Sequence, residues 1–132
     1  MTNDPDRSWY YAVRFRAPAD VASWPRNFVI LTGWATTGEQ WTDAENQEAN
    51  ERLEAQLKGS GKWYAPITGY APATGHAEPG FAVELTPEEG TLLGRVFRQD
   101  AIYAIREGEL SVRYCEDGRE EVVHEEWSEL VD

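Results

Sequence analysis

The chain has few cysteines, few histidines and few basic residues, and each of these low counts argues against a class of function. Cysteine occurs once, at Cys115, so no intrachain disulfide can form, as is typical of a reducing cytoplasm. The whole chain has only two histidines in addition to this one cysteine, so a structural zinc site is disfavoured. Lys and Arg number 12 against 24 Asp and Glu, a net charge of -12. This balance disfavours direct binding to a nucleic-acid backbone or an anionic membrane.

Long hydrophobic runs are also missing. No apolar run reaches membrane-spanning length, and the N-terminal segment lacks the apolar stretch of a secretory signal. We therefore expect a cytoplasmic protein. Aromatic residues make up 12% of the 132 residues, which argues against disorder and fits a single domain over 1–132. Residues 1–8 are polar and are expected to be flexible.

The longest apolar run is residues 27–34, NFVILTGW. A short apolar run bounded by turn signals is typical of a strand buried on both faces in the middle of a sheet. Composition and alternation predict further strands at 9–15, 62–68, 81–85, 101–106, 110–115 and 120–124. A Gly/Pro/Ala-rich segment at 69–80 predicts a loop that is long enough to be functional.

Two T-x-x-E capping boxes predict helix starts, at Thr42 and at Thr86. The first helix has an apolar stripe and is expected to end near Gly59; the stripe consists of Ala49, Leu53 and Leu57. The second helix has Pro87 at its first position. We expect it to turn four apolar side chains inward, those of Leu92, Leu93, Val96 and Phe97.

From residue 27 to residue 106 the predicted order is strand, helix, strand, strand, helix, strand. This order predicts an α+β protein with a ferredoxin-like β-α-β-β-α-β core and an antiparallel sheet in the order fourth, first, third, second. An N-terminal strand and a C-terminal antiparallel hairpin or meander extend it. This topology gathers strand and helix ends at one edge, where we expect Thr32, Trp34, Glu45, Asn46, Glu78, Gln99 and Asp100.

Each of these residues has a structural and a functional interpretation. Asn46 lies on the apolar stripe of its helix, so its amide either pins the loop after the central strand or contacts a ligand. Gln99 either satisfies carbonyls at a helix end or points into a cleft. Trp34 and Trp41 either pack as core and lid or sandwich a planar ligand.

The three carboxylates at this edge also allow two interpretations. These carboxylates are Glu45, Glu78 and Asp100. In the structural interpretation they cap helices and stay solvated. In the functional interpretation they form a cluster that binds a divalent cation or an amine, or that acts as an acid/base pair. No P-loop, no G-x-S-x-G motif and no zinc-deaminase motif is present. We therefore predict no cofactor and no metal.

Four short motifs carry a family resemblance. They are residues 28–34, Ala44-Glu45-Asn46, Glu78-Pro79-Gly80-Phe81 and Val96-Phe97-Arg98-Gln99-Asp100-Ala101. Together, over residues 27–115, they resemble the bacterial family called domain of unknown function 3293. The matching residues are Thr32, Trp34, Glu45, Asn46, Glu78, Phe97, Gln99 and Ala101. The chain departs from the family pattern at Gly33, Ala35, Thr36, His76 and Arg98. The resemblance implies no established activity.

Acidic residues are concentrated in the C-terminal part of the chain. We expect an acidic face made of Glu116, Asp117, Glu120, Glu121, Glu125 and Glu126. Our first hypothesis is that this face holds a basic protein partner, as a non-enzymatic interaction module or an inhibitor encoded by a phage or mobile element.

The alternative places function at the predicted edge of the sheet. There the protein would be a binding protein or enzyme for a small molecule, nucleotide-like or amine, with a site formed by Thr32, Trp34, Asn46, Glu78 and Gln99. A third hypothesis treats these residues as architectural, with function in a partner chain. Whether the protein is an enzyme, and its oligomeric state, are left open by the sequence.

Overall fold

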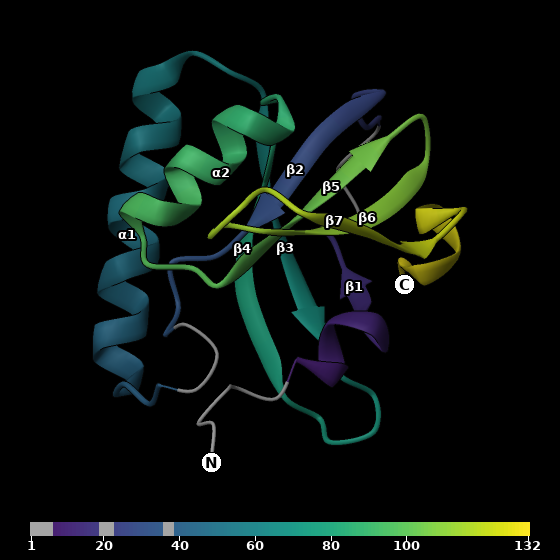
Figure 1. The fold of residues 1–132 in the computed structure, drawn as a ribbon. Coiled ribbons are helices and arrows are strands. Elements are labelled where there is room, and N and C mark those ends of the chain that lie inside the picture. Colours follow the sequence, from purple (N-terminus) through teal and green to yellow (C-terminus); the bar gives the residue numbers. More distant parts are fainter. Residues whose placement is uncertain (1–6, 19–22, 36–38) are drawn as a thin grey trace.

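The computed structural model describes residues 7–18, 23–35 and 39–132. These residues form an α+β structure with two α-helices and a seven-stranded antiparallel sheet (Figure 1). In chain order the elements are η1 (Ser8–Tyr11), β1 (Arg14–Arg16), β2 (Asn27–Leu31), α1 (Asp43–Ser60), β3 (Tyr64–Tyr70), β4 (Ala77–Val83), α2 (Pro87–Val96), β5 (Ala101–Arg106), β6 (Glu109–Tyr114), β7 (Glu120–His124) and η2 (Trp127–Leu130).

Strand β2 lies in the middle of the sheet, whose order is β1-β3-β4-β2-β5-β6-β7. It pairs with β4 on one side, where Leu31 faces Phe81, and with β5 on the other, where Ile30 faces Tyr103. Four of its five residues are buried, so the apolar run forms a two-faced central strand as predicted.

Both helices cover the same face of the sheet (Figure 1). Leu53 and Leu57 of α1 pack there against apolar residues of β2, β4 and β5. Both capping boxes are formed, at Thr42 with Glu45 and at Thr86 with Glu89. The end of α1 differs from the prediction, because Gly61, with a φ of 72°, takes the left-handed position expected for Gly59.

Helix α2 presents a different face to the sheet than the sequence predicts. Its contact residues are Gly90 and Gly94: an added Cβ would lie 2.8 Å from Ile102 Cδ1 at Gly90 and 2.9 Å from Cys115 Sγ at Gly94. Two residues expected to point inward are consequently exposed, Leu92 at 61% and Val96 at 64%. The other two, Leu93 and Phe97, pack into the core on the helix side of the sheet as predicted. The close approach through glycine therefore turns only part of the predicted apolar face outward.

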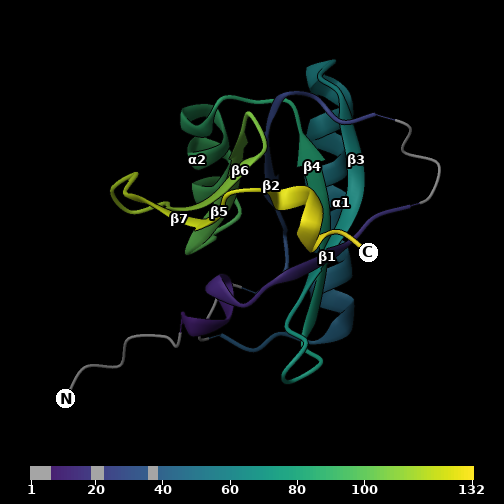
Figure 2. The same ribbon diagram turned by 90° about the vertical axis from the view of Figure 1, so that its right-hand side faces the viewer.

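Among the described residues, no α-helix covers the other face of the sheet, which is closed by the two 3-10 helices and by the curling of the sheet. Phe15 of β1 forms a bridge with Val131, and the Asp132 amide donates to the Phe15 carbonyl at 2.8 Å, which places the C-terminal segment beside β1 (Figure 2). Aromatic rings fill the space inside, among them Phe28, Tyr103 and Trp127.

Two predicted segments are corrected. The predicted strand at 9–15 is largely the turn η1, and β1 comprises only Arg14–Arg16. The predicted loop at 69–80 is mostly a β-hairpin, because β3 and β4 pair as far as Tyr70 and Ala77. Gly80 serves close strand packing instead of a turn, since an added Cβ would collide with the Leu31 carbonyl oxygen.

The expected flexibility of residues 1–8 concerns mainly residues 1–6, which lie outside the described residues, as do 36–38 of the loop after β2. Arg7 and Ser8 are described. The Arg7 guanidinium donates two hydrogen bonds to Asp100, and Ser8 begins η1.

Candidate functional site

A cavity of about 50 Å³ lies between η1 and the face of the sheet opposite α1 and α2, near the end of β2. Its walls are largely aromatic and aliphatic, with Trp9, Tyr10, Phe15 and Tyr103 supplying the rings. Three of its polar side chains come from the ends of elements: Thr32 after β2, Glu78 near the start of β4 and Gln99 after α2. The hydroxyl groups of Tyr10 and Tyr103 belong to two further lining residues. Residues predicted to meet at one edge of the sheet therefore line a single hollow.

Glu78 is the only charged residue among the described residues that line this cavity. Its side chain is 14% exposed, and its Oε2 lies 3.6 Å from Nε2 of His76. Burial raises the pKa of the Glu78 carboxyl, and the neighbouring His76 offsets part of this effect. The residue opposite Glu78 on β3 is Gly69, which has no side chain to fill the space.

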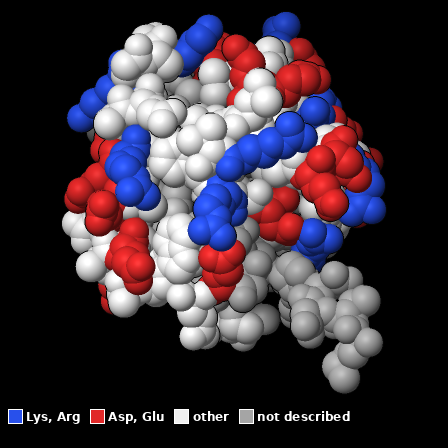
Figure 3. Space-filling model, turned by 60° about the vertical axis from the view of Figure 1, so that its left-hand side comes forward, with Lys and Arg blue, Asp and Glu red and all other residues white. Residues whose placement is uncertain are grey.

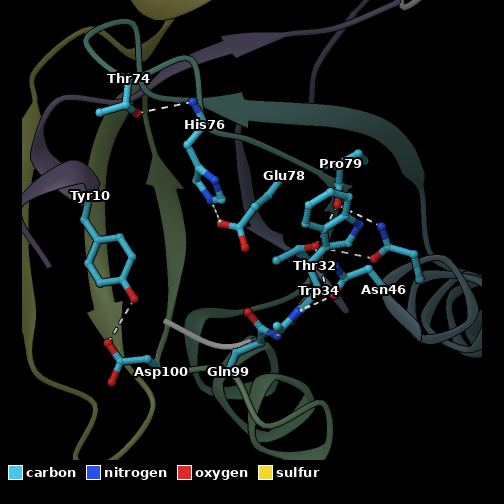
Figure 4. Close-up of polar contacts among 12 residues, drawn as sticks. Tyr10, Thr32, Trp34, Asn46, Thr74, His76, Glu78, Pro79, Gln99 and Asp100 are labelled. Atoms are coloured by element: carbon cyan, nitrogen blue, oxygen red, sulfur yellow. Dashed lines mark hydrogen bonds and ion pairs between the residues drawn. The ribbon is translucent and has the colours of Figure 1, made fainter. Parts of the chain in front are cut away.

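The position of Glu78 is visible in Figure 4. Its carboxylate faces the space bounded by Tyr10, His76 and Gln99, and the amide oxygen of Gln99 faces the same space. The amide nitrogen of Gln99 is already used, because it donates to the Trp34 carbonyl at 2.8 Å and to the Phe97 carbonyl at 3.2 Å. The cavity thus offers at least two acceptor groups, the Glu78 carboxyl and the amide oxygen of Gln99.

Thr32 and Asn46 fix the backbone around the end of β2. Thr32 Oγ1 donates to the Pro79 carbonyl at 2.6 Å and accepts from the Trp34 amide at 3.1 Å. Asn46 Oδ1 accepts from the Ala35 amide at 2.8 Å. These contacts agree with the architectural interpretation of Asn46, since its side chain holds the loop after the central strand.

Asn50 has a similar role that sequence analysis missed. Its Oδ1 accepts from the Gly33 amide at 2.7 Å, and its Nδ2 donates to the Pro79 carbonyl at 2.8 Å. It therefore ties α1 to both β2 and β4. The signal was its position one helical turn after Asn46, on the same face of α1.

Asp100 fixes the wall of the cavity. It accepts hydrogen bonds from Arg7 and, at 2.9 Å, from the Tyr10 hydroxyl, while the Tyr103 hydroxyl donates to the Tyr10 carbonyl at 2.8 Å. Burial acts to raise the pKa of Asp100, but the hydrogen bonds from Arg7 and Tyr10 outweigh it, so the pKa is lowered. Asp100 is thus an ionised anchor for η1.

Glu45 does not join this group. Its carboxylate accepts from the Thr42 amide at 3.0 Å in the capping box, which lowers its pKa, and it is exposed. Trp41 lines a different hollow, between α1 and α2, and its indole N–H donates to Glu39 at 3.2 Å. Trp34 lines neither hollow, so these two cavities give no support to a Trp34–Trp41 sandwich.

Arginines interleave with the acidic residues predicted to form an interaction face. Glu120 pairs with Arg106 at 2.7 Å and with Arg113 at 3.2 Å. Glu121 lies 3.9 Å from Arg119, and the Asp117 carboxylate accepts from the Arg119 amide at 2.9 Å. The side chains of Glu116, Glu125 and Glu126 are exposed. The face is therefore of mixed charge around β7.

The family assignment follows from the sequence that builds this site. Residues 31–102, more than half of the chain, match the family model described as Protein of unknown function (DUF3293). The chain belongs to this family. The matched span runs from the end of β2 to the start of β5 and contains all seven residues expected at the edge of the sheet. No curated protein and no solved structure matched the chain.

Within residues 7–18, 23–35 and 39–132, no group of three or more His, Cys, Asp or Glu residues is arranged to hold a metal ion. No helix in those residues has the length and apolar character needed to span a membrane.

Proposed function

We propose that this protein binds a small molecule that carries a protonated amine, with the ammonium group held by Glu78 inside the aromatic cavity. The observation that carries the proposal is the position of that carboxylate: Glu78 is the only charged residue among the described residues that line the cavity, and its ion-pair partner His76, at 3.6 Å, lies outside that lining. Glu78 is largely buried, and no Lys or Arg is among the described residues that line the cavity. A buried carboxylate without a strong counter-ion favours any ligand that supplies one.

The surrounding side chains favour a cation for a second reason. Ammonium groups are attracted to the faces of Trp, Tyr and Phe rings within about 6 Å. Rings of Trp9, Tyr10 and Tyr103 line the cavity beside Glu78. The Gln99 amide oxygen adds a second acceptor for an ammonium N–H, so carboxylate, amide and rings all favour the same charge.

The size of the cavity favours an amine over a nucleotide-like ligand, the two ligand classes that the sequence suggested. Its volume of about 50 Å³ accommodates roughly four water molecules. Sites for nucleotide-sized ligands enclose about 300 Å³ or more. The enclosed part therefore fits an ammonium group and one or two attached carbons, and the remainder of the ligand would lie at the mouth near His76.

The proposal includes an interpretation of the fold and of location. We interpret β2-α1-β3-β4-α2-β5 as a ferredoxin-like core, which is supported by the strand order β5-β2-β4-β3 and by two helices on one face. A cytoplasmic location stays a prediction. A basic protein partner at the acidic residues around β7 also stays a prediction, and the arginines that interleave with them make it the less favoured function.

Calorimetric titration with simple amines tests the proposal. Ethylamine and putrescine should bind, whereas ethanol, which is similar in size to ethylamine but uncharged, should not. Glu78→Gln keeps the shape and removes the charge, so it should weaken amine binding about thirtyfold or more, equivalent to roughly 2 kcal/mol. Glu84→Gln, at an exposed residue outside the cavity, is the matched control. Equal binding of ethanol, or unchanged amine binding by Glu78→Gln, would refute the proposal.

A further inference from the structure

A second hollow lies between α1 and α2, on the face of the sheet opposite the Glu78 cavity. Its volume is about 210 Å³, and its lining includes Trp41, Arg52, Val96 and Arg98. Figure 3 shows the helix side of the molecule, where Lys and Arg side chains cross and flank an uncharged area and Asp and Glu side chains lie next to several of them. Because the two hollows lie on opposite faces, a role for this one is independent of amine binding.

Part of the apolar lining of this groove comes from Val96, which α2 turns away from the sheet, whereas Leu92 on the same helix does not line the groove itself. Leu92 and Val96 lie one helical turn apart and are 61% and 64% exposed. Val96 shares the groove with the half-buried ring of Trp41. The structure thus leaves a short apolar ridge uncovered beside a groove, which is the geometry that receives an amphipathic helix.

The charge of the groove opposes that of the protein as a whole. Two arginines line it, Arg52 and Arg98, and no carboxylate is among the described residues that do so. Each arginine has one long, exposed ion pair at its outer side, with Glu48 at 3.5 Å and with Glu39 at 3.4 Å. Exposed pairs of this kind are weak, so a carboxylate from a partner can replace them.

Arg98 adds an observation from the backbone. Its φ is 57°, in the left-handed region that favours glycine. It ends α2 in a Schellman arrangement, with the Gln99 amide donating to the Gly94 carbonyl at 2.8 Å and the Arg98 amide to the Arg95 carbonyl at 3.1 Å. A residue held in this conformation lowers stability, and such positions are concentrated at functional sites. The arginine side chain is therefore present where the backbone alone favours glycine.

We propose that the groove between α1 and α2 docks an acidic amphipathic helix of a partner protein. Apolar side chains of that helix cover Trp41, Leu92 and Val96, and its flanking carboxylates bind Arg52 and Arg98. The charge of the occupant follows from the two arginines, and its helical form follows from the ridge at one-turn spacing. At physiological ionic strength charges beyond about 8 Å are screened, so the distant acidic residues contribute little to the electrostatic potential at the groove.

Fluorescence anisotropy of labelled peptides with the full-length protein tests this proposal. The probe is a helical peptide of about four turns with a leucine stripe flanked by glutamates, and its matched control has lysine in place of each glutamate. The glutamate peptide should bind saturably and the lysine peptide at least about tenfold more weakly. The double variant Leu92→Ser, Val96→Ser should weaken binding of the glutamate peptide about tenfold or more.

Two further variants separate binding from folding. Arg98→Gly should weaken binding of the glutamate peptide while raising Tm, because it removes the side chain and relaxes the backbone. Val122→Ser changes an equally exposed apolar residue, 55% exposed on β7, and should leave binding unchanged. The proposal is overturned by no saturable binding, by equal or tighter binding of the lysine peptide, or by unchanged binding in the Leu92, Val96 double variant.

Discussion

Replacing Asn50 by alanine should destabilise the protein without changing amine binding. The side chain of Asn50 makes two hydrogen bonds to backbone, one to the partly buried Gly33 amide and one to the exposed Pro79 carbonyl. Leaving a partly buried amide without its partner costs about 1–2 kcal/mol, whereas water can replace most of the bond at the exposed carbonyl. The sum is about 2 kcal/mol of the free energy of unfolding.

For a chain of this length, 2 kcal/mol corresponds to a decrease in Tm of about 5–8 °C. Urea denaturation should show a lower midpoint with an unchanged slope, since the surface exposed on unfolding stays the same. Gln47→Ala is the control on the same helix, because Gln47 is exposed and makes a single bond of 3.3 Å to Glu51. A loss below about 0.5 kcal/mol in Asn50→Ala would refute the architectural role given to this amide.

Three other outcomes follow from the structure. Glu78→Gln should raise Tm at pH 7. The pKa of Glu78 in the folded state is raised above 4.5, so the folded state binds this proton more tightly than the unfolded state does. The stability of the wild-type protein therefore falls as pH rises from 4.5 through the folded-state pKa, and the glutamine variant avoids this loss. A Tm-against-pH series in both proteins measures the difference, which should vanish at the acid end. Gly33→Ala should lower stability by about 1–3 kcal/mol in urea melts, because its Cβ would lie 2.8 Å from the Ala49 carbonyl. Leu92→Ala should change stability by less than about 0.5 kcal/mol, whereas Leu53→Ala, at a residue with 0% exposure, should cost about 2–5 kcal/mol; equal losses would contradict the observed face of α2.

Local signals in the sequence predicted the helices and the central strand well. Both helix starts are set by side chains three residues apart, and the structure forms both capping boxes at Thr42 and Thr86. The apolar run at 27–34 became the middle strand because it has no polar face to offer to water. Features that depend on neighbouring residues in the chain are therefore visible before the structure is known.

Features that depend on the distance between elements were not visible. The apolar pattern of α2 predicted the wrong face at Leu92 and Val96, because glycine at 90 and 94 lets the helix approach the sheet closely. The glycines in the segment 69–80 predicted a loop, but Gly80 permits close strand packing. A hydrophobic pattern records which residues avoid water and carries no information on how near a partner lies.

The sequence predicted only part of the candidate site, because some of its residues depend on how distant elements pack. The predicted topology brings Thr32, Glu78 and Gln99 near one another, and all three line the cavity. The aromatic wall was missed, because Trp9 and Tyr10 lie in a 3-10 turn that was predicted to be a strand. The cavity itself depends on Gly69 facing Glu78 across a hairpin that was predicted to be a loop.

The central claim is that Glu78 holds a cation inside the cavity, and ¹³C NMR of the glutamate side-chain carboxyl carbons tests it most directly. The Glu78 signal, assigned by its loss in Glu78→Gln, is followed against pH with and without ethylamine. We expect a pKa above 4.5 without the amine and a lower pKa when the amine is bound, since the ammonium group favours the carboxylate. A Glu78 titration curve that stays the same at saturating amine would show that Glu78 does not hold the ammonium group.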